Sequence, residues 1–322
     1  MNADSCPPSS ARKRLLLWGF RLAVLVAVVY GVQRSLLDGL RQLSHCPWRL
    51  DPVWLSVGGA VYLLALLPSA LFWRQILAAM GQEAGVGETA RAYYIGHLGK
   101  YFPGKALVVI LRAGLIRSHR VDPVVAGTSV FVETFTMMAV GSVFSAVVIP
   151  FWFPQRWPLI AAVVGLAVLL GLPTLPPVFR MVVRAVPFLT SDPVRRECLV
   201  RLRAPTLFWG WVANVIGWLV AGASLWAVMR SLGGPTGSLA GLPLYAAAVA
   251  IASVGGFLSM IPAGLFVREA ILVELLAGDF GASLALVGAL VFRLVSLVAE
   301  VLISVILYVA GPRPAAVVSS PE

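Results

Sequence analysis

The chain has 322 residues, of which 59% are hydrophobic and only 12% charged. Soluble domains carry about 25% charged residues, so this composition excludes a soluble globular protein and predicts an all-α polytopic membrane protein. The net charge of +11 is spread over short loops between apolar spans, which is typical of membrane orientation signals and argues against nucleic acid as a partner. No polar stretch is long enough for a separate soluble domain, so residues 1–322 are predicted to form one integral membrane domain.

Apolar segments of spanning length predict six full membrane spans. They lie at 15–33, 53–73, 123–150, 158–178, 206–230 and 283–310. Two further apolar segments, 84–118 and 241–278, are interrupted and are predicted to be re-entrant hairpins of broken helices. The first half is thus 14–178 and the second half 206–311, joined by an arginine-rich connector at 179–205.

The first interrupted segment carries Lys100, Lys105 and Arg112 and breaks at Pro103-Gly104. A cation at the centre of a plain span costs about 2.5–3.5 kcal/mol, so a simple membrane crossing is disfavoured. The second breaks at Pro262-Ala263-Gly264 and continues into Arg268-Glu269. Interrupted segments at corresponding positions of two halves indicate a transporter-type site near the bilayer midplane.

The spacing of features suggests an internal repeat. Adding 160 to Gly104 gives Gly264, and adding 160 to Glu133 gives Arg293. If each hairpin enters and leaves on one face, the two open from opposite faces, as in an inverted repeat. The termini then share the side with most loop Lys and Arg residues, so both termini are predicted to be cytoplasmic. The alternative is that apolar segments simply resemble one another.

Polar stripes mark two of the spans. Ser129, Glu133 and Thr136 share one helix face, and a second stripe follows the last span. That second stripe consists of Arg293, Ser296, Glu300 and Ser304. Such stripes face protein or a wet cavity, so Glu133 and Arg293 are expected to approach each other or to share a cavity. The pair is either a structural lock between the halves or a contact to substrate.

The interrupted segments form a second candidate site, because the start of each new half-helix exposes backbone N–H groups that favour an anion. Lys100, Lys105 and Arg112 would line one such site, and Arg268 with Glu269 the other. The alternatives are cations that extend to lipid headgroups and a local Arg268–Glu269 ion pair.

Enzymatic motifs are not indicated. The stretch 99–105 has the GxxxxGK spacing of a nucleotide-binding loop, but Ala106 stands where a Ser or Thr would bind magnesium. The sequence shows neither HExxH nor GxSxG, and its three cysteines are scattered. We therefore predict no enzymatic activity, no cofactor and no metal site.

The same residues resemble a known family, the transmembrane flippase-like domain of lysylphosphatidylglycerol synthases, also called multiple peptide resistance factors. The resemblance is carried by LGKYFPGK at 98–105 and GGFLSMIPAGLFVREA at 255–270, and it extends over roughly 15–310. The second block is similar to the family pattern G-x-x-x-x-I-P-G-G-x-G-x-R-E, with Ala263 and Phe266 in place of two glycines. Leu107-Val108 likewise replace a Gly-Glu pair of many members.

This resemblance implies a stand-alone branch without the soluble acyltransferase-like domain, so synthase activity is not expected. It implies a flippase-like protein of the cytoplasmic (inner) membrane that translocates an anionic phospholipid or lipid-linked headgroup between leaflets. Two alternatives remain: a non-transporting partner or regulator of an envelope-lipid enzyme, and an ion-coupled carrier of small carboxylates. A homo-oligomer or an envelope-enzyme partner is possible under any of the three.

Overall fold

The computed structural model divides the chain into two units, residues 1–48 and 49–322, and every helix below belongs to the second. The predicted first span and most of the predicted connector lie outside the described residues, as do Pro103, Gly104, Lys105 and Pro262. The described residues are 50–101, 106–116, 121–175, 177–178, 181, 202–233, 239–261 and 264–310.

Five helices in the described part of the chain are long and apolar enough to cross a membrane. They are α2 (Pro52–Ala79), α5 (Pro123–Trp152), α6 (Trp157–Gly171, continued by the 3-10 turn η2, Leu172–Thr174), α10 (Ala204–Ser231) and α13 (Ala282–Ala310). A helix of 28 residues, such as α2, is about 42 Å long, whereas the hydrocarbon core is about 30 Å thick. The predicted all-α polytopic fold is confirmed, with these helices matching five of the six predicted spans.

Two of these helices begin with the same local device. The Asp51 side chain accepts a hydrogen bond from the Val53 N–H at 2.8 Å, and Asp122 accepts one from Val124 at 2.7 Å. A proline follows each aspartate at the first helical position. An Asp cap satisfies a free N–H group, and proline lacks the N–H that would otherwise need a partner there, so Asp-Pro marks a sharp helix start.

The first interrupted segment folds as a hairpin of two short helices. Helix α3 (Val86–His97) continues into the 3-10 turn η1 (Leu98–Tyr101), and α4 (Ala106–Ile116) runs back beside α3. Neither helix is long enough to cross a bilayer, which takes about 20 residues. The hairpin enters and leaves at one end of the bundle, because the Asp122 N–H donates to Gln82 Oε1 at 2.7 Å.

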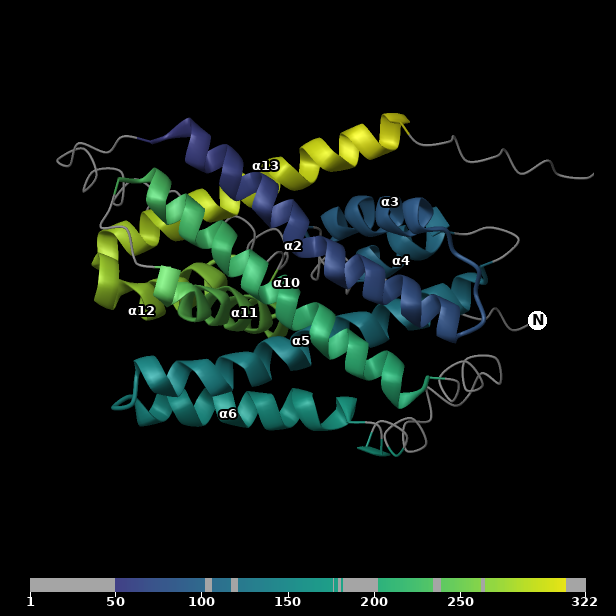
Figure 1. The fold of residues 1–322 in the computed structure, drawn as a ribbon, viewed down its shortest axis with the longest axis horizontal. Coiled ribbons are helices and arrows are strands. Elements are labelled where there is room, and N and C mark those ends of the chain that lie inside the picture. The colour runs from purple at the N-terminus through teal and green to yellow at the C-terminus, as the bar shows by residue number, and fades with distance from the viewer. Residues whose placement is uncertain are drawn as a thin grey trace, which may run out of the picture. The chain divides into compact units, whose positions relative to one another are not determined.

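The second interrupted segment is also a hairpin, made of α11 (Leu242–Leu258, after the 3-10 turn η3, Leu239–Gly241) and α12 (Val267–Phe280). Its two outer ends meet, since the rings of Tyr245 and Phe280 are 6.2 Å apart. It opens at the other end of α2, where the Asp51 N–H donates to Ser231 O at the end of α10. Figure 1 shows α3 and α4 at one end and α11 and α12 at the other.

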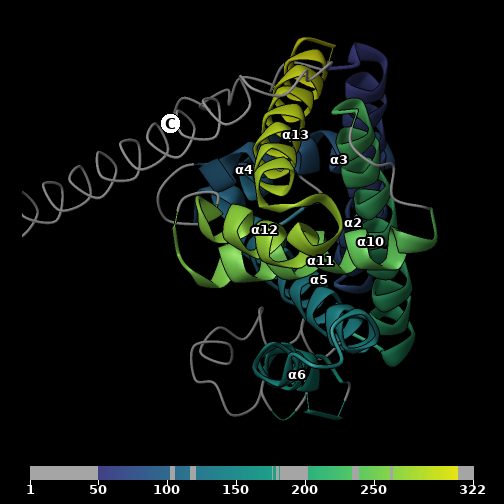
Figure 2. The ribbon, with the colours of Figure 1, turned by 90° about the vertical axis from the view of Figure 1, so that its left-hand side faces the viewer.

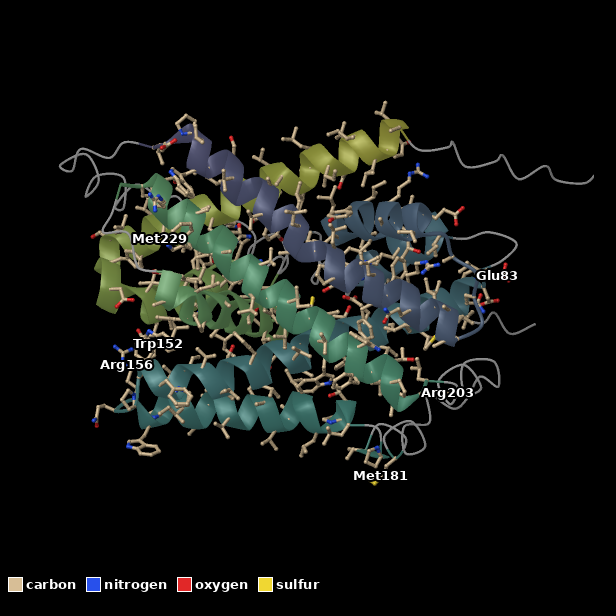
Figure 3. All side chains as sticks on the ribbon, viewed as in Figure 1. Glu83, Trp152, Arg156, Met181, Arg203 and Met229 are labelled. Carbon is tan, nitrogen blue, oxygen red and sulfur yellow. The ribbon has the colours of Figure 1, made fainter. Side chains whose placement is uncertain are left out.

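Helices α2 and α10 run antiparallel between the hairpins and pack closely along their lengths. Helix α6 packs on α5 at the outside, as two perpendicular views agree (Figures 1 and 2). The two ends are marked in Figure 3 by Glu83 and Arg203 on one side and by Trp152 and Arg156 on the other. In chain order, α2, the first hairpin and α5 match α10, the second hairpin and α13, with the direction reversed.

Candidate functional site

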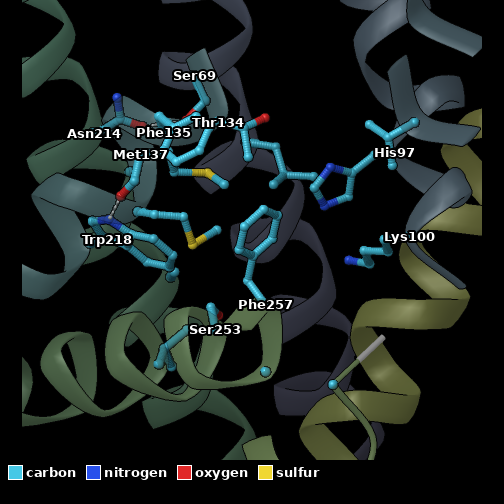
Figure 4. Close-up of a pocket in the computed structure, with 18 of the residues that line it drawn as sticks. Ser69, His97, Lys100, Thr134, Phe135, Met137, Asn214, Trp218, Ser253 and Phe257 are labelled. Atoms are coloured by element: carbon cyan, nitrogen blue, oxygen red, sulfur yellow. Dashed lines mark hydrogen bonds between the residues drawn. The ribbon is translucent and has the colours of Figure 1, made fainter. Parts of the chain in front are cut away.

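A cavity of about 390 Å³ lies where the tips of the two hairpins meet α2, α5 and α10. Residues of both repeats line it, including Ser69 and Lys100 from the first and Asn214 and Phe257 from the second. Figure 4 shows His97 and Lys100 on one side of this space and Met137 and Trp218 on the opposite side. Two interrupted helices therefore contribute to one central site, as the sequence pattern indicates.

The cavity is cationic on one side. Its basic lining residues are His97, Lys100, Arg112 and Arg268, and no Asp or Glu belongs to its described lining. Arginine and lysine in a low-dielectric space attract an anion strongly, because water does not screen them. The lining therefore favours a negatively charged group in this part of the cavity.

Arg112 forms the most completely buried ion pair of the described residues. Its Nη1 lies 2.8 Å from Glu133 Oε2, with the two side chains 3% and 0% exposed. The guanidinium lies 3.8 Å from the centre of the Tyr93 ring, and the Tyr93 hydroxyl donates to Glu133 Oε1 at 3.1 Å. The stripe of Ser129, Glu133 and Thr136 is buried as expected. The ion pair and its contacts with Tyr93 hold α4 against α5.

Lys100 joins the first hairpin to the second repeat. Its Nζ lies 2.5 Å from Glu300 Oε1 on α13, and the Tyr62 hydroxyl of α2 donates to the same oxygen. His97 Nε2 lies 3.6 Å away from it. The interpretation that Lys100 extends to lipid headgroups is wrong, because its ammonium group pairs inside the protein.

The second hairpin has the corresponding pair with the charges exchanged. Arg293 on α13 bonds Glu269 on α12 at 2.5 Å, just as Arg112 on α4 bonds Glu133 on α5. The local Arg268–Glu269 ion pair, which was the alternative to a binding role, is therefore not formed. Arg268 instead donates to Ser253 Oγ at 3.2 Å, and no carboxylate of the described residues forms an ion pair with it.

The expected approach of Glu133 to Arg293 is wrong. Each is paired within its own repeat, and neither lines the cavity. The offset of 160 correctly relates their positions in the two repeats, but each finds its partner on the neighbouring helix of its own half. Each pair therefore joins two helices of one repeat, and neither pair connects the two halves.

The charges around the cavity do not cancel. Four cations face three carboxylates in the described interior, which leaves one positive charge in excess. They are Lys100, Arg112, Arg268 and Arg293 against Glu133, Glu269 and Glu300. A buried charge without a partner is costly, so the excess charge at Arg268 favours the binding of one anion.

The other side of the cavity is apolar and reaches the outer surface. Phe131 and Phe135 of α5 line it, and each is 52% exposed. One helical turn separates them, so they form the edge of an opening on the flank of the bundle rather than at its ends. On a helix of membrane-spanning length, that flank is the side that lipid contacts.

Sequence reasoning did not identify several polar residues of the cavity, and it did not pair Glu300. Tyr62, His97 and Ser253 gave no signal, because single polar residues in apolar segments resemble ordinary core residues. Glu300 was placed on the correct buried face, but its pairing with Lys100 requires the hairpin path. Gly264, which belongs to the second predicted helix break, lies between α11 and α12 and lines the cavity. The described residues contain no cluster of three or more metal-ligand side chains.

The sequence was compared with known proteins. The sequence profile of the lysylphosphatidylglycerol synthase TM region matches residues 16–304. No curated protein matches the chain. The match includes both hairpins, the three Arg or Lys ion pairs found in the interior of the described residues, and every residue of the cavity lining. The chain therefore belongs to the family of the lysylphosphatidylglycerol synthase transmembrane region.

Proposed function

We propose that this protein translocates an anionic lipid between the leaflets of a membrane. The observation that carries the proposal is the two-sided cavity, with Lys100, Arg112 and Arg268 on one side and Phe131 and Phe135 at its exposed edge. A phosphate-bearing headgroup fits the cationic side, and acyl chains fit the apolar flank. Membership in a lipid-related membrane family supports the same substrate class.

The inverted arrangement of the hairpins supports movement across the membrane. One hairpin opens at each end of the bundle, and their tips border the same cavity. Opening one tip at a time would expose the cavity to one leaflet at a time, as alternating access requires. A cavity of about 390 Å³ accommodates a headgroup but not a whole phospholipid, so the chains would stay outside.

The alternative of a non-transporting regulator predicts a closely packed contact between the halves, and the central cavity argues against it. A carrier of small carboxylates predicts a narrow polar pocket closed to lipid. The exposed phenylalanines at the edge of the cavity favour a lipid instead.

The test is a leaflet-exposure assay with the purified protein in liposomes containing fluorescent phosphatidylglycerol. We expect the protein to accelerate the crossing of this anionic lipid, and Arg268→Gln to remove most of the acceleration. Arg230→Gln is the matched control, because Arg230 lies at the end of α10 over the Trp54 ring, outside the cavity. Arg268→Lys, which keeps the charge, should retain part of the activity.

Equal lipid crossing by Arg268→Gln and the unaltered protein would contradict the role of the cavity. Lipid crossing no faster than in empty liposomes, with protein shown to be folded by its thermal transition, would contradict the proposed function itself.

A further inference from the structure

The Lys100 ammonium group is shared between the cavity and a buried carboxylate. Lys100 lines the cavity and its side chain is 21% exposed, whereas the Glu300 side chain is 1% exposed and is not part of the lining. An anion that enters the cavity therefore approaches the Lys100 ammonium group from the cavity side, while Glu300 binds the same ammonium group from the protein interior. The two negative groups compete for one cation.

Among the described residues, Lys100 is the one permanently charged side chain within ion-pair distance of Glu300. Its Oε1 accepts from Lys100 and Tyr62, but its Oε2 is buried with no hydrogen-bond partner among the described residues. The other groups that face this cluster are His97 from α3, Tyr101 from η1, Arg268 from α12 and Arg293 on α13 itself. Helix α10 also contacts α13, and its one charged side chain, Arg230, lies at its end.

Removing Lys100 from Glu300 would leave an ionised carboxylate buried without a paired cation. Such a charge costs several kcal/mol in a low-dielectric interior, and a carboxylate in that position takes up a proton instead. Arg268 cannot replace Lys100 here if it binds the same incoming anion. Protonation of Glu300 is then the route that avoids the buried charge.

We infer that an anion bound by Lys100 and Arg268 enters the cavity together with one proton, which binds Glu300. The anion brings one negative charge and the proton one positive charge, so the net charge of the interior is unchanged. This inference rests on the proposed function for the anion, and it adds a coupling proton to it. The ligand chemistry is a phosphodiester with one negative charge, either in a lipid headgroup or free in solution.

The experiment measures ligand affinity against pH with the purified full chain in lipid nanodiscs. Two phosphodiester probes are used, fluorescent phosphatidylglycerol and its soluble headgroup glycerophosphoglycerol, between about pH 5 and pH 8, because a phosphodiester keeps one negative charge over this range whereas a monoester titrates at about pH 6. If one proton is linked to binding, affinity rises up to about tenfold for each pH unit lowered. Glu300→Gln removes the titrating group, so its affinity should be independent of pH over this range.

Glu269→Gln is the matched control, because Glu269 is also buried and paired but does not contact Lys100. It should keep the pH dependence of the unaltered protein. His97→Gln tests the nearby imidazole and should also keep it. If Glu300→Gln does not fold, a pH dye in weakly buffered solution should report uptake of about one proton per ligand bound by the unaltered protein.

Binding by the unaltered protein without proton uptake would overturn the inference. A pH dependence that survives in Glu300→Gln but disappears in His97→Gln would overturn it too, by placing the proton on the imidazole. Proton linkage with either probe supports it, and linkage with the lipid alone identifies the headgroup as the source. Proton-linked binding without lipid crossing would refute only the transport proposal, and crossing with pH-independent binding only this inference.

Discussion

The two hairpins follow the same path, but their tips are held by different forces. The first tip is held by ion pairs between side chains. Lys100 pairs with Glu300, and Arg112 pairs with Glu133 while its guanidinium lies over the ring of Tyr93. The second tip is instead shaped by unusual backbone torsion angles. Met260, Gly264 and Phe266 have φ angles of +57°, +63° and +66°, in the left-handed region.

This difference assigns the hairpins separate tasks. The buried pair of Arg112 and Glu133 is costly to separate, so it fixes the first hairpin against α5. The second tip is shaped by its turns, and Arg268 is left to hydrogen-bond a serine rather than a carboxylate. Left-handed backbone at non-glycine residues stores strain of about 1–3 kcal/mol and is concentrated at functional sites. The second hairpin therefore offers a ligand a cation that pairs with no carboxylate of the described residues, whereas Lys100 of the first hairpin is bound to Glu300 until an anion competes for it.

The largest expected effect comes from breaking the support of the first hairpin. Arg112→Gln leaves Glu133 charged and buried, so the free energy of unfolding should fall by about 3–5 kcal/mol. Thermal or denaturant unfolding of the detergent-solubilised protein measures this loss. The control is Arg156→Gln, which removes the exposed pair with Glu274 and should cost no more than about 1 kcal/mol.

Charge exchange sharpens the same test. Arg112→Glu combined with Glu133→Arg should recover part of the stability that either single change removes, because the pair is restored in reverse. Glu133→Arg combined with Arg293→Glu should recover none. Recovery by the second combination would mean that Glu133 and Arg293 are partners after all.

The fold was largely predictable from the sequence, and the pairings were not. Apolar length and the Pro-Gly interruptions were enough to locate five of the six predicted spans and both hairpins, because each reflects a requirement of the bilayer. Which carboxylate meets which cation depends on helix rotation and on the path of the hairpins. Equal positions in two repeats say nothing about contact, and for this reason Glu133 was matched with Arg293 rather than with Arg112.

The backbone conformation of the second tip was also not predictable from the sequence. The family pattern has glycine where this chain has Phe266, but the pattern alone gives no torsion angle. The structure supplies the reason for that glycine, since Phe266 has a φ of +66° and a ψ of −39° just before α12. Gly264 also has a positive φ, of +63°, which glycine adopts without the strain that other residues would have there.

Gly264→Ala should produce the next largest effect, by disturbing the second tip. Alanine is strained at this φ by about 1–2 kcal/mol, and its Cβ would lie 2.6 Å from the Gly256 Cα, so the backbone would have to shift. We expect a loss of stability of about 2 kcal/mol or more and weaker anion binding. Gly278→Ala is the control, because a Cβ there meets nothing within 4 Å and alanine favours the helix. Equal effects of the two changes would contradict this account of the tip.

The smallest expected effect concerns Phe266, one of the residues at which this chain departs from the family pattern. Phe266→Gly relieves the left-handed strain but loses some packing, so stability should rise by about 0.5 kcal/mol. Phe266→Val should lower it by about 1 kcal/mol, because β-branched side chains tolerate positive φ worst. The control, Phe208→Gly in the regular helix α10, should lose about 1 kcal/mol. If Phe266→Gly destabilises the protein as much as Phe208→Gly does, then packing rather than backbone shape holds the second tip, and the contrast between the hairpins is lost.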